Sequence, residues 1–243
     1  MTGTAVNRIH LWSGPRNIST AMMYSFAQRS DTQVVDEPLY AHYLRETGLQ
    51  HPGREEVLAS QENDGQRVVE WMMSASFTKP VVFFKQMTHH LINLPFDFLA
   101  SCKNILLIRD PKDVLISYSK VIEHPALTDI GIRQSYELFQ FLQSRQYHAI
   151  VLDADEVLHN AEAMMKVLCG ALGIAFQPAM LRWQPGARPE DGVWAKYWYS
   201  KVHQSTGLTR FEKTETELPL GLKAVRAEAM PYYRFLYDHS IKP

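Results

Sequence analysis

Residues 10–22 read His-Leu-Trp-Ser-Gly-Pro-Arg-Asn-Ile-Ser-Thr-Ala-Met, and this stretch decides the fold. The apolar run to Trp12 predicts a buried strand, Ser-Gly-Pro predicts a tight turn, and the residues from Ser19 onward favour a helix. Because the first N–H groups of a helix lack intrahelical partners, a strand, turn and helix in this order form an anion site. Arg16 adds a planar guanidinium suited to phosphate or sulfate oxygens. Ser19 and Thr20 carry hydroxyls that can cap the helix or donate to an oxygen.

The stretch departs from the nucleotide-binding pattern of kinases and GTPases, G-x-x-x-x-G-K-[ST]. Gly14 is followed by Pro-Arg-Asn-Ile-Ser-Thr, so both the second glycine and the lysine are missing. Taken alone, the stretch fits an ordinary strand–turn–helix junction better than an anion site.

Residues 105–118 form a second stretch of the same kind, Ile-Leu-Leu-Ile-Arg-Asp-Pro-Lys-Asp-Val-Leu-Ile-Ser-Tyr. A buried strand ends at Arg109, Pro111 suits the first turn of a helix, and Ser117 falls on that helix. By itself, Arg109 beside Asp110 fits a plain ion pair at a helix start. Together, the two stretches predict phosphate sites at the carboxyl ends of two strands, which suits a cofactor with phosphates at two places.

The pair of stretches resembles the binding elements of sulfotransferases that use 3′-phosphoadenosine-5′-phosphosulfate (PAPS), of the soluble, bacterial type. The resemblance implies an α/β fold of three layers with a central parallel sheet, like that of P-loop NTPases. It implies PAPS as co-substrate without a metal, and a small-molecule, carbohydrate or lipid acceptor bearing a hydroxyl or an amine. Arg109 and Ser117 match the 3′-phosphate ligands. The loop for the 5′-phosphosulfate corresponds to Gly14, Pro15, Arg16, Asn17, Ile18, Ser19 and Thr20. Ile18 stands where the family usually has glycine, which reduces backbone freedom there.

Strands and helices alternate along the chain, which favours a parallel sheet with helices on both faces. We expect one domain over residues 1–243, with a polar surface excursion at 50–66. The expected strands are 8–12, 33–36, 81–85, 104–108 and 148–152. The expected helices are 19–28, 68–78, 129–145 and 220–237.

Composition describes an ordinary globular protein of 243 residues, with 46% hydrophobic residues and a formal net charge of −1. The lack of a basic excess argues against nucleic acid as a partner, so an anionic cofactor must be met by local charge. Cys102 and Cys169 lie far apart in apolar settings, which predicts buried reduced thiols. No run approaches membrane-spanning length and no signal core is visible, so we expect a cytoplasmic protein. A homodimer is compatible with the sequence.

Two segments supply candidates for the base that sulfuryl transfer requires. Glu37 follows the strand 33–36, and Glu37-Pro38-Leu39 resembles the Glu-Pro-Leu of carbohydrate-type sulfotransferases, where the glutamate serves as base. A simpler interpretation is that the Glu37 carboxylate caps the next helix. His89 and His90 follow the strand 81–85, loosely resembling the Lys-Thr-His of cytosolic sulfotransferases, and a neutral imidazole is a competent base. We place Glu37 first and His90 as its rival, with Arg16 and Lys85 stabilising charge on the sulfuryl group.

Residues 184–215 are a candidate lid, because an aromatic run at 194–199 is followed by a polar loop at 202–207. Ser205 or Thr206 could then reach a phosphate, although aromatic residues at this density also suit core packing. The late Arg-Lys-Gly element of the family is not recognisable, and Arg210 and Lys213 are weak substitutes for it.

Two other functions compete with sulfuryl transfer. A nucleotide-dependent small-molecule kinase on a P-loop fold would need the missing lysine. A non-catalytic nucleotide-binding relative fits the departure at Ile18 and the absent late element.

Overall fold

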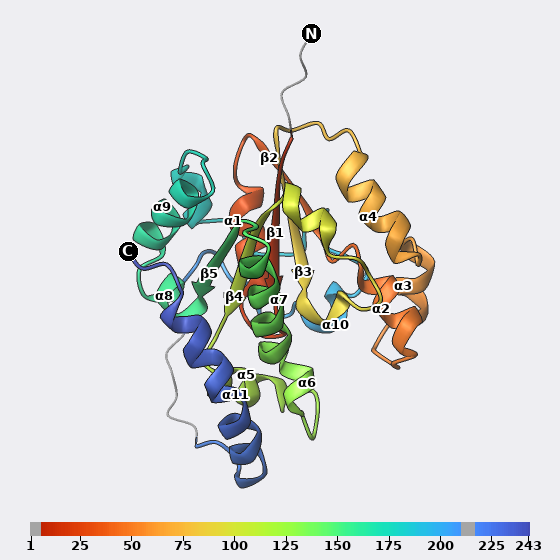
Figure 1. The fold of residues 1–243 in the computed structure, drawn as a ribbon, viewed down its shortest axis with the longest axis vertical. Helices are drawn as coiled ribbons and strands as arrows, with labels where there is room; N and C mark the ends of the chain where they lie inside the picture. Colours follow the sequence, from red (N-terminus) through yellow and green to blue (C-terminus); the bar gives the residue numbers. More distant parts are fainter. Residues whose placement is uncertain (1–5, 210–216) are drawn as a thin grey trace.

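A parallel sheet of five strands lies between two layers of helices, in a computed structural model that describes residues 6–209 and 217–243 (Figure 1). The strand order is β2-β3-β1-β4-β5, and every neighbouring pair is parallel. The strands are β1 (Asn7–Ser13), β2 (Thr32–Asp36), β3 (Val81–Met87), β4 (Lys103–Ile108) and β5 (Ala149–Asp153). The expected α/β fold with a central parallel sheet is thereby confirmed.

The register of the sheet brings the ends of β1, β2 and β3 to one edge. Ser13 pairs with Met87 of β3 and with Leu107 of β4, and Asp36 pairs with Lys85. Strand β1 lies between β3 and β4, so the chain leaves its carboxyl end at the point where strand order diverges. In sheets of this type, ligands bind in the crevice at that point.

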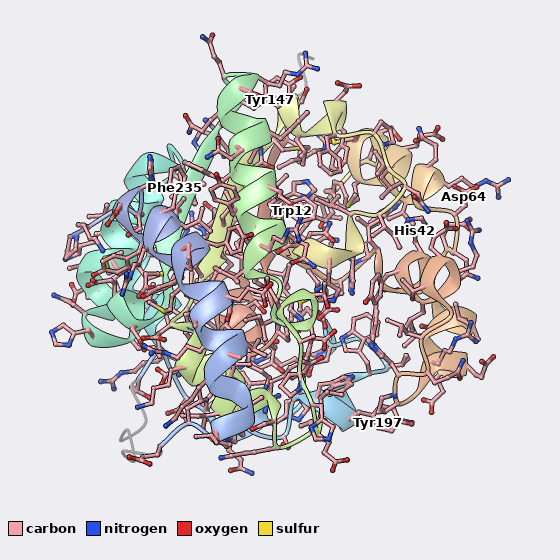
Figure 2. All side chains as sticks on the ribbon, turned by 60° about the horizontal axis from the view of Figure 1, so that its bottom comes forward. Trp12, His42, Asp64, Tyr147, Tyr197 and Phe235 are labelled. Atoms are coloured by element: carbon pink, nitrogen blue, oxygen red, sulfur yellow. The ribbon has the colours of Figure 1, made fainter. Side chains whose placement is uncertain are left out.

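Side-chain alternation along the strands supplies both faces with a core. Trp12 and Phe84 point to the face covered by α4 (Gly65–Ser74), α7 (Ile132–Ser144) and α11 (Leu220–Asp238). Leu11 and Phe83 point to the other face, covered by α1 (Ser19–Ala27) and α9 (Ala161–Ala171). Figure 2 shows Trp12 in the interior, beside α7, and Tyr197 at the periphery. Both faces are apolar because a parallel sheet is buried on both sides.

A third apolar cluster joins helices at the carboxyl edge of the sheet. It combines α2 (Tyr40–Thr47), α3 (Arg54–Ser60) and α10 (Ala195–Trp198). The expected excursion at 50–66 therefore contains α3, whose Val57 is fully buried in this cluster. Helix α4 also begins earlier than expected, because Asp64 caps it by accepting from the N–H groups of Gln66 and Arg67.

The helix expected at 129–145 is confirmed over 132–144, but its expected start is wrong, because the chain turns at Gly131. The chain forms α6 (Leu127–Ile130), turns at Gly131 with φ 72°, and continues as α7. The cause lies in the first loop. A Cβ on Gly131 would come within 2.9 Å of the Gly14 Cα, and a Cβ on Gly14 within 2.1 Å of the Ile130 carbonyl oxygen. Glycine at both positions permits this close approach.

The remaining helices are short except for the last. Helix α5 (Pro111–Tyr118) follows β4 with Asp110 as its N-cap, and α8 (Ala154–His159) follows β5 with Asp153 as its cap. Helix α11 matches the expected helix at 220–237. Cys102 and Cys169 are buried and free, as expected. Within the described part of the chain, no helix combines the length and the apolar character needed to cross a membrane.

Candidate active site

The loop after β1 has the backbone shape of an anion site. Arg16 and Ile18 both have left-handed φ angles, 62° and 59°. Ile18 therefore adopts the conformation that glycine favours, at the family's usual glycine position. It is the N-cap of α1, and no side chain among the described residues caps this helix end, so the expected capping by Ser19 or Thr20 is not observed. The first N–H groups of α1 keep their capacity to bind an anion.

Hydrogen bonds join this loop to the second stretch. The Arg16 Nε donates to the Ser117 Oγ at 3.0 Å, and an Arg109 guanidinium nitrogen donates to the Arg16 carbonyl oxygen at 3.1 Å. The buried Asn17 side chain donates to the Leu107 carbonyl oxygen of β4 at 3.1 Å. The two candidate phosphate elements are therefore parts of one site.

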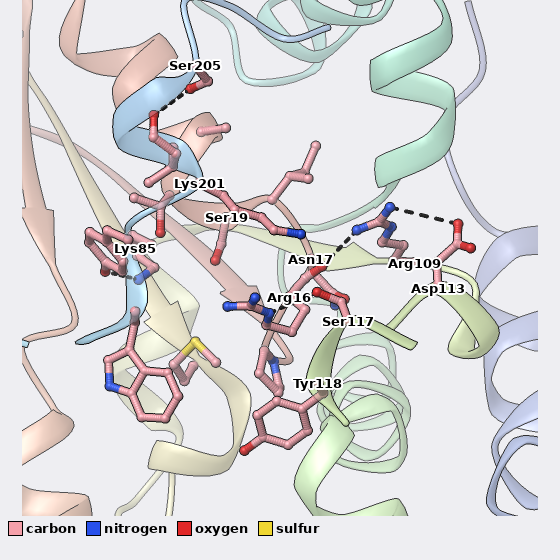
Figure 3. A pocket seen from close by; sticks show the side chains of 18 of the residues that line it. Arg16, Asn17, Ser19, Lys85, Arg109, Asp113, Ser117, Tyr118, Lys201 and Ser205 are labelled. Carbon is pink, nitrogen blue, oxygen red and sulfur yellow. Dashed lines mark hydrogen bonds and ion pairs between the residues drawn. The ribbon is translucent and has the colours of Figure 1, made fainter. Parts of the chain in front are cut away.

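A cavity of about 600 Å³ contains most of the expected site residues. Figure 3 shows Arg16 between Lys85 on one side and Arg109 on the other. Expected residues that line the cavity are Pro15, Arg16, Asn17, Ile18, Ser19, Thr20, Glu37, Lys85, His90, Arg109, Ser117 and Ser205. Two expected residues do not line it. Gly14 packs against the backbone at Ile130, and Thr206 is exposed.

Positive charge gathers in the part of the cavity near the loop. Lys120 and Lys201 line it together with Arg16 and Arg109. Burial lowers the pKa of Lys201, and the like charges of Lys120, Arg16 and Arg109 lower it further. Burial likewise lowers the pKa of Arg16. A cluster of cations that destabilise one another favours the binding of a multiply charged anion.

Glu37 and Lys85 form a buried pair at the other side of the cavity. The Lys85 Nζ donates to the Glu37 Oε1. Glu37 does not cap α2, whose N-cap is Leu39 without a side-chain hydrogen bond. Burial raises the pKa of Glu37 against the opposing effect of the Lys85 charge. The carboxyl group therefore has the greater proton affinity that a general base needs.

The backbone of Glu37 is also unusual. Its φ is 38°, which is rare for a residue with a side chain. Its N–H donates to the Lys85 carbonyl oxygen at 2.8 Å, and its carbonyl oxygen accepts from the Gln61 side chain at 3.0 Å. Strained residues held from several sides concentrate at functional sites, which supports Glu37 as part of the reaction centre.

Two residues of this cluster are missed by the sequence reasoning. Asp36 forms an ion pair with Lys85, whose Nζ lies 3.1 Å from the Asp36 Oδ1. The Tyr199 hydroxyl donates to the Asp36 Oδ2 at 2.8 Å. Asp36 had a visible signal, since it directly precedes Glu37 at the end of a strand. Tyr199 stands in the aromatic run, where the sequence gives no reason to prefer it over its neighbours.

The histidines after β3 sit in aromatic surroundings. His90 stacks on Tyr40 with ring centroids 5.1 Å apart and on Tyr43 at 4.7 Å. Burial lowers the pKa of His89 to about 4 and that of His90 well below its usual value. Both rings are therefore neutral at pH 7, and their low proton affinity makes them weaker bases than Glu37.

The candidate lid is described up to residue 209. The Ser205 hydroxyl donates to the Val202 carbonyl oxygen at 2.7 Å and accepts from the Trp183 indole at 3.2 Å, so its proton is already in use. Lys201, from the same segment, presents a charge to the cavity. Arg210 and Lys213 lie outside the described residues.

Comparison with known proteins identifies relatives of this chain. The profile of the family described as sulfotransferase domain matches residues 7–239. Branched-chain-amino-acid aminotransferase-like protein 1 of Arabidopsis thaliana is 40% identical over 232 residues, an alignment that covers 95% of this chain and 42% of that protein. The chain thus spans less than half the length of this curated relative.

Two solved structures share the fold. The sulfotransferase domain from the Synechococcus PCC 7002 olefin synthase has a TM-score of 0.54 at 18% identity, covering 94% of this chain and 96% of that one. The sulfotransferase domain from the curacin biosynthetic pathway has a TM-score of 0.56 at 16% identity, covering 99% and 100%. At these identities the likeness establishes the fold, which is the P-loop-like fold of sulfotransferases.

Proposed function

The chain belongs to the sulfotransferase domain family, and from this premise we propose that it moves a sulfuryl group from PAPS to a hydroxyl or amine of an acceptor. The acceptor is a small molecule, a carbohydrate or a lipid. The observation that carries the proposal is the hydrogen bond from Arg16 to Ser117, which joins the two candidate anion-binding elements in one cavity with the Glu37–Lys85 pair.

The residues of the cavity fit a donor with phosphates at two places. The uncapped start of α1 and the Arg16 guanidinium suit the 5′-phosphosulfate. Arg109 and Ser117 suit the 3′-phosphate, and both line the same cavity. Lys120 and Lys201 supply further positive charge.

The chemistry divides between the two sides of the cavity. Glu37 takes the proton of the acceptor hydroxyl or amine as the new bond to sulfur forms. The bond from sulfur to the phosphate oxygen breaks, and the electron pair leaves with adenosine 3′,5′-bisphosphate (PAP). Arg16 and the N–H groups of α1 stabilise the charge on the oxygens between donor and acceptor. Lys85 stabilises the ionised form of Glu37 before the transfer.

Calorimetric binding of PAP, compared with ATP and magnesium, tests the donor site. Tight binding of PAP that does not depend on magnesium supports the proposal. A preference for ATP with magnesium would replace it with the kinase function, and binding of neither would remove nucleotide chemistry from this cavity. Binding of PAP without turnover on a panel of acceptors would favour the non-catalytic relative.

Glu37→Gln tests the base. We expect a loss of turnover of about a hundredfold or more, because an amide cannot take the proton of the acceptor. PAP affinity should change little, since the expected phosphate ligands are Arg16, Arg109 and Ser117 and not Glu37. Steady-state rates with PAPS and a screened acceptor, together with calorimetry, measure both. If turnover survives, the base is another group, and His90→Gln and His89→Gln are the next variants to measure.

A further inference from the structure

A buried polar cluster surrounds the candidate base, and half of it has no part in the mechanism above. Asp36, Glu37, Lys85 and Tyr199 are 6%, 7%, 2% and 5% exposed. The proposed function uses Glu37 and Lys85. Asp36 and Tyr199 are left without a role, although burying a carboxylate and a phenol is costly unless every polar atom is satisfied.

The ammonium of Lys85 is held in three directions. An ammonium has three donors. Lys85 donates to the Glu37 Oε1, lies 3.1 Å from the Asp36 Oδ1, and donates to the Tyr199 hydroxyl at 2.6 Å. All three donors therefore have acceptors within the cluster.

The hydroxyl of Tyr199 also has all its hydrogen-bonding positions filled. A phenol hydroxyl donates once and can accept twice. That of Tyr199 donates to Asp36 at 2.8 Å and accepts from Lys85 and from the Trp194 indole, the latter at 3.1 Å. The Gly192 N–H also donates to Asp36, at 3.2 Å. The aromatic segment 192–199 is thus fastened to Asp36 at two points.

We propose that Asp36 and Tyr199 are positioning residues that hold the Lys85 ammonium against Glu37. This inference rests on the proposed function of Glu37 as base. The donor brings several negative charges into the same cavity, and a lysine bound only to Glu37 could turn its ammonium toward them. Asp36 supplies a second carboxylate, and Tyr199 supplies a third acceptor. Lys85 therefore stays in place, and Glu37 meets the acceptor in one orientation.

The electrostatics of the cluster fit this division of roles. The charges of Asp36 and Glu37 raise the pKa of Lys85 despite its burial, so the ammonium is retained. Burial raises the pKa of Glu37, Lys85 opposes that change, and Asp36 adds to it. The titratable groups around Glu37 come from several elements. They are Asp36 of β2, Lys85 of β3, Tyr40 of α2 and Tyr199 after α10, together with His90, whose pKa the Lys85 charge lowers.

Tyr199→Phe and Asp36→Asn test the proposal, with Tyr197→Phe as the matched control. Tyr197 lies in α10, is 42% exposed, and donates its hydroxyl to Glu56 outside the cavity. The probe is PAPS with water as the acceptor. Glu37 takes the proton of water, the oxygen bonds to sulfur, and sulfate and PAP are released. We expect kcat to fall about tenfold or more in Tyr199→Phe, with the Kd of PAP changing less than about twofold. Tyr197→Phe should match the wild-type protein in both.

The titration of Glu37 gives a second readout that does not require turnover. It is followed by the carbon-13 signal of the carboxyl group in labelled protein, assigned with Glu37→Gln. Asp36→Asn removes the like charge, so the midpoint of Glu37 in the free protein should move to lower pH. In the complex with PAP, Lys85 is no longer held by Asp36 and turns toward the phosphates, so PAP should raise the midpoint of Glu37 more in Asp36→Asn than in the wild-type protein. Asparagine has the shape of aspartate, so this variant also serves if Tyr199→Phe does not fold.

Failure of the proposed function and failure of this inference have different signatures. A wild-type protein that binds PAP but never releases sulfate refutes sulfuryl transfer, while the titration of Glu37 still reports on Asp36. The same effect of PAP on the midpoint of Glu37 in Asp36→Asn and in the wild-type protein, or the same kcat in Tyr199→Phe and Tyr197→Phe, would overturn the inference and show that the two residues serve only in packing.

Discussion

At the scale of single residues, the sequence reveals side chains that stand next to a recognisable pattern. Arg16, Arg109 and Ser117 belong to two recognisable strand–turn–helix stretches, and all three line the cavity. The partnership of Asp36 with Tyr199 was not predictable, because it joins residues 163 positions apart through a hydroxyl in an aromatic run. Such pairs depend on how the chain returns to the sheet edge, which local sequence does not encode.

The surroundings of His10 also come from distant parts of the chain, and they lead to a prediction about how stability depends on pH. It is fully buried, stacks on Phe84 at 4.6 Å, and neither ring nitrogen has a partner among the described residues. Burial lowers its pKa to about 3. Below pH 6.5 the unfolded chain binds a proton that the folded protein refuses, so stability falls as the pH is lowered toward 3.

We therefore expect His10→Phe to lose less stability than the wild-type protein between pH 8 and pH 5. The difference should be about 2 kcal/mol in the free energy of unfolding, from one proton taken up by the unfolded chain. Urea unfolding at the two pH values measures it, and the other histidines contribute equally to both proteins. Identical losses would mean that His10 is protonated in the folded state.

At the scale of elements, hydrophobic patterns predict the strands well and the start of one helix poorly. The strands are runs of buried residues bounded by polar ones, so local sequence is sufficient to find them. The helix expected at 129–145 has a continuous pattern, yet it breaks at Gly131 because the Gly14 backbone lies against it. That contact is between distant parts of the chain, so a sequence window cannot contain its cause. It also gives Gly14 its role, which is to let α6 and α7 approach the loop.

Gly131→Ala should therefore destabilise the protein more than Gly173→Ala. Both glycines have left-handed φ angles, 72° and 66°, so alanine costs about 1–2 kcal/mol at either position. A Cβ at Gly173 meets nothing within 4 Å, whereas at Gly131 it meets the Gly14 backbone at 2.9 Å. We expect an additional cost of about 1–3 kcal/mol for that overlap. Thermal and urea unfolding compare the two. Equal costs would show that the loop moves away freely.

At the scale of the whole molecule, the net charge is close to zero, and positive charge is concentrated at one place. The net charge is −1, yet Arg16, Arg109, Lys120 and Lys201 face one cavity. The composition correctly indicates that any attraction for an anion must come from such a cluster. It gives no sign of Lys120 or Lys201, although Lys120 follows Ser117 by three residues and Lys201 directly precedes the polar loop at 202–207. These cations repel one another in the free protein, so an anion that neutralises them stabilises the fold.

Lys201→Ala tests this cluster, with Lys166→Ala as its control. Lys166 lies on α9 and pairs with Glu162, away from the cavity. We expect Lys201→Ala to raise the Kd of PAP about two- to fivefold, the effect of one partly exposed charge on a phosphate. The loss should be smaller at high salt, where the wild-type affinity is itself reduced by screening. PAP at a hundred times its Kd should raise the free energy of unfolding by about 2.7 kcal/mol in each protein. Calorimetry at two salt concentrations and thermal unfolding provide these values. If Lys201→Ala and Lys166→Ala bind PAP equally well, Lys201 does not face the phosphates, and the anion is held by the loop, Arg16 and Arg109 alone.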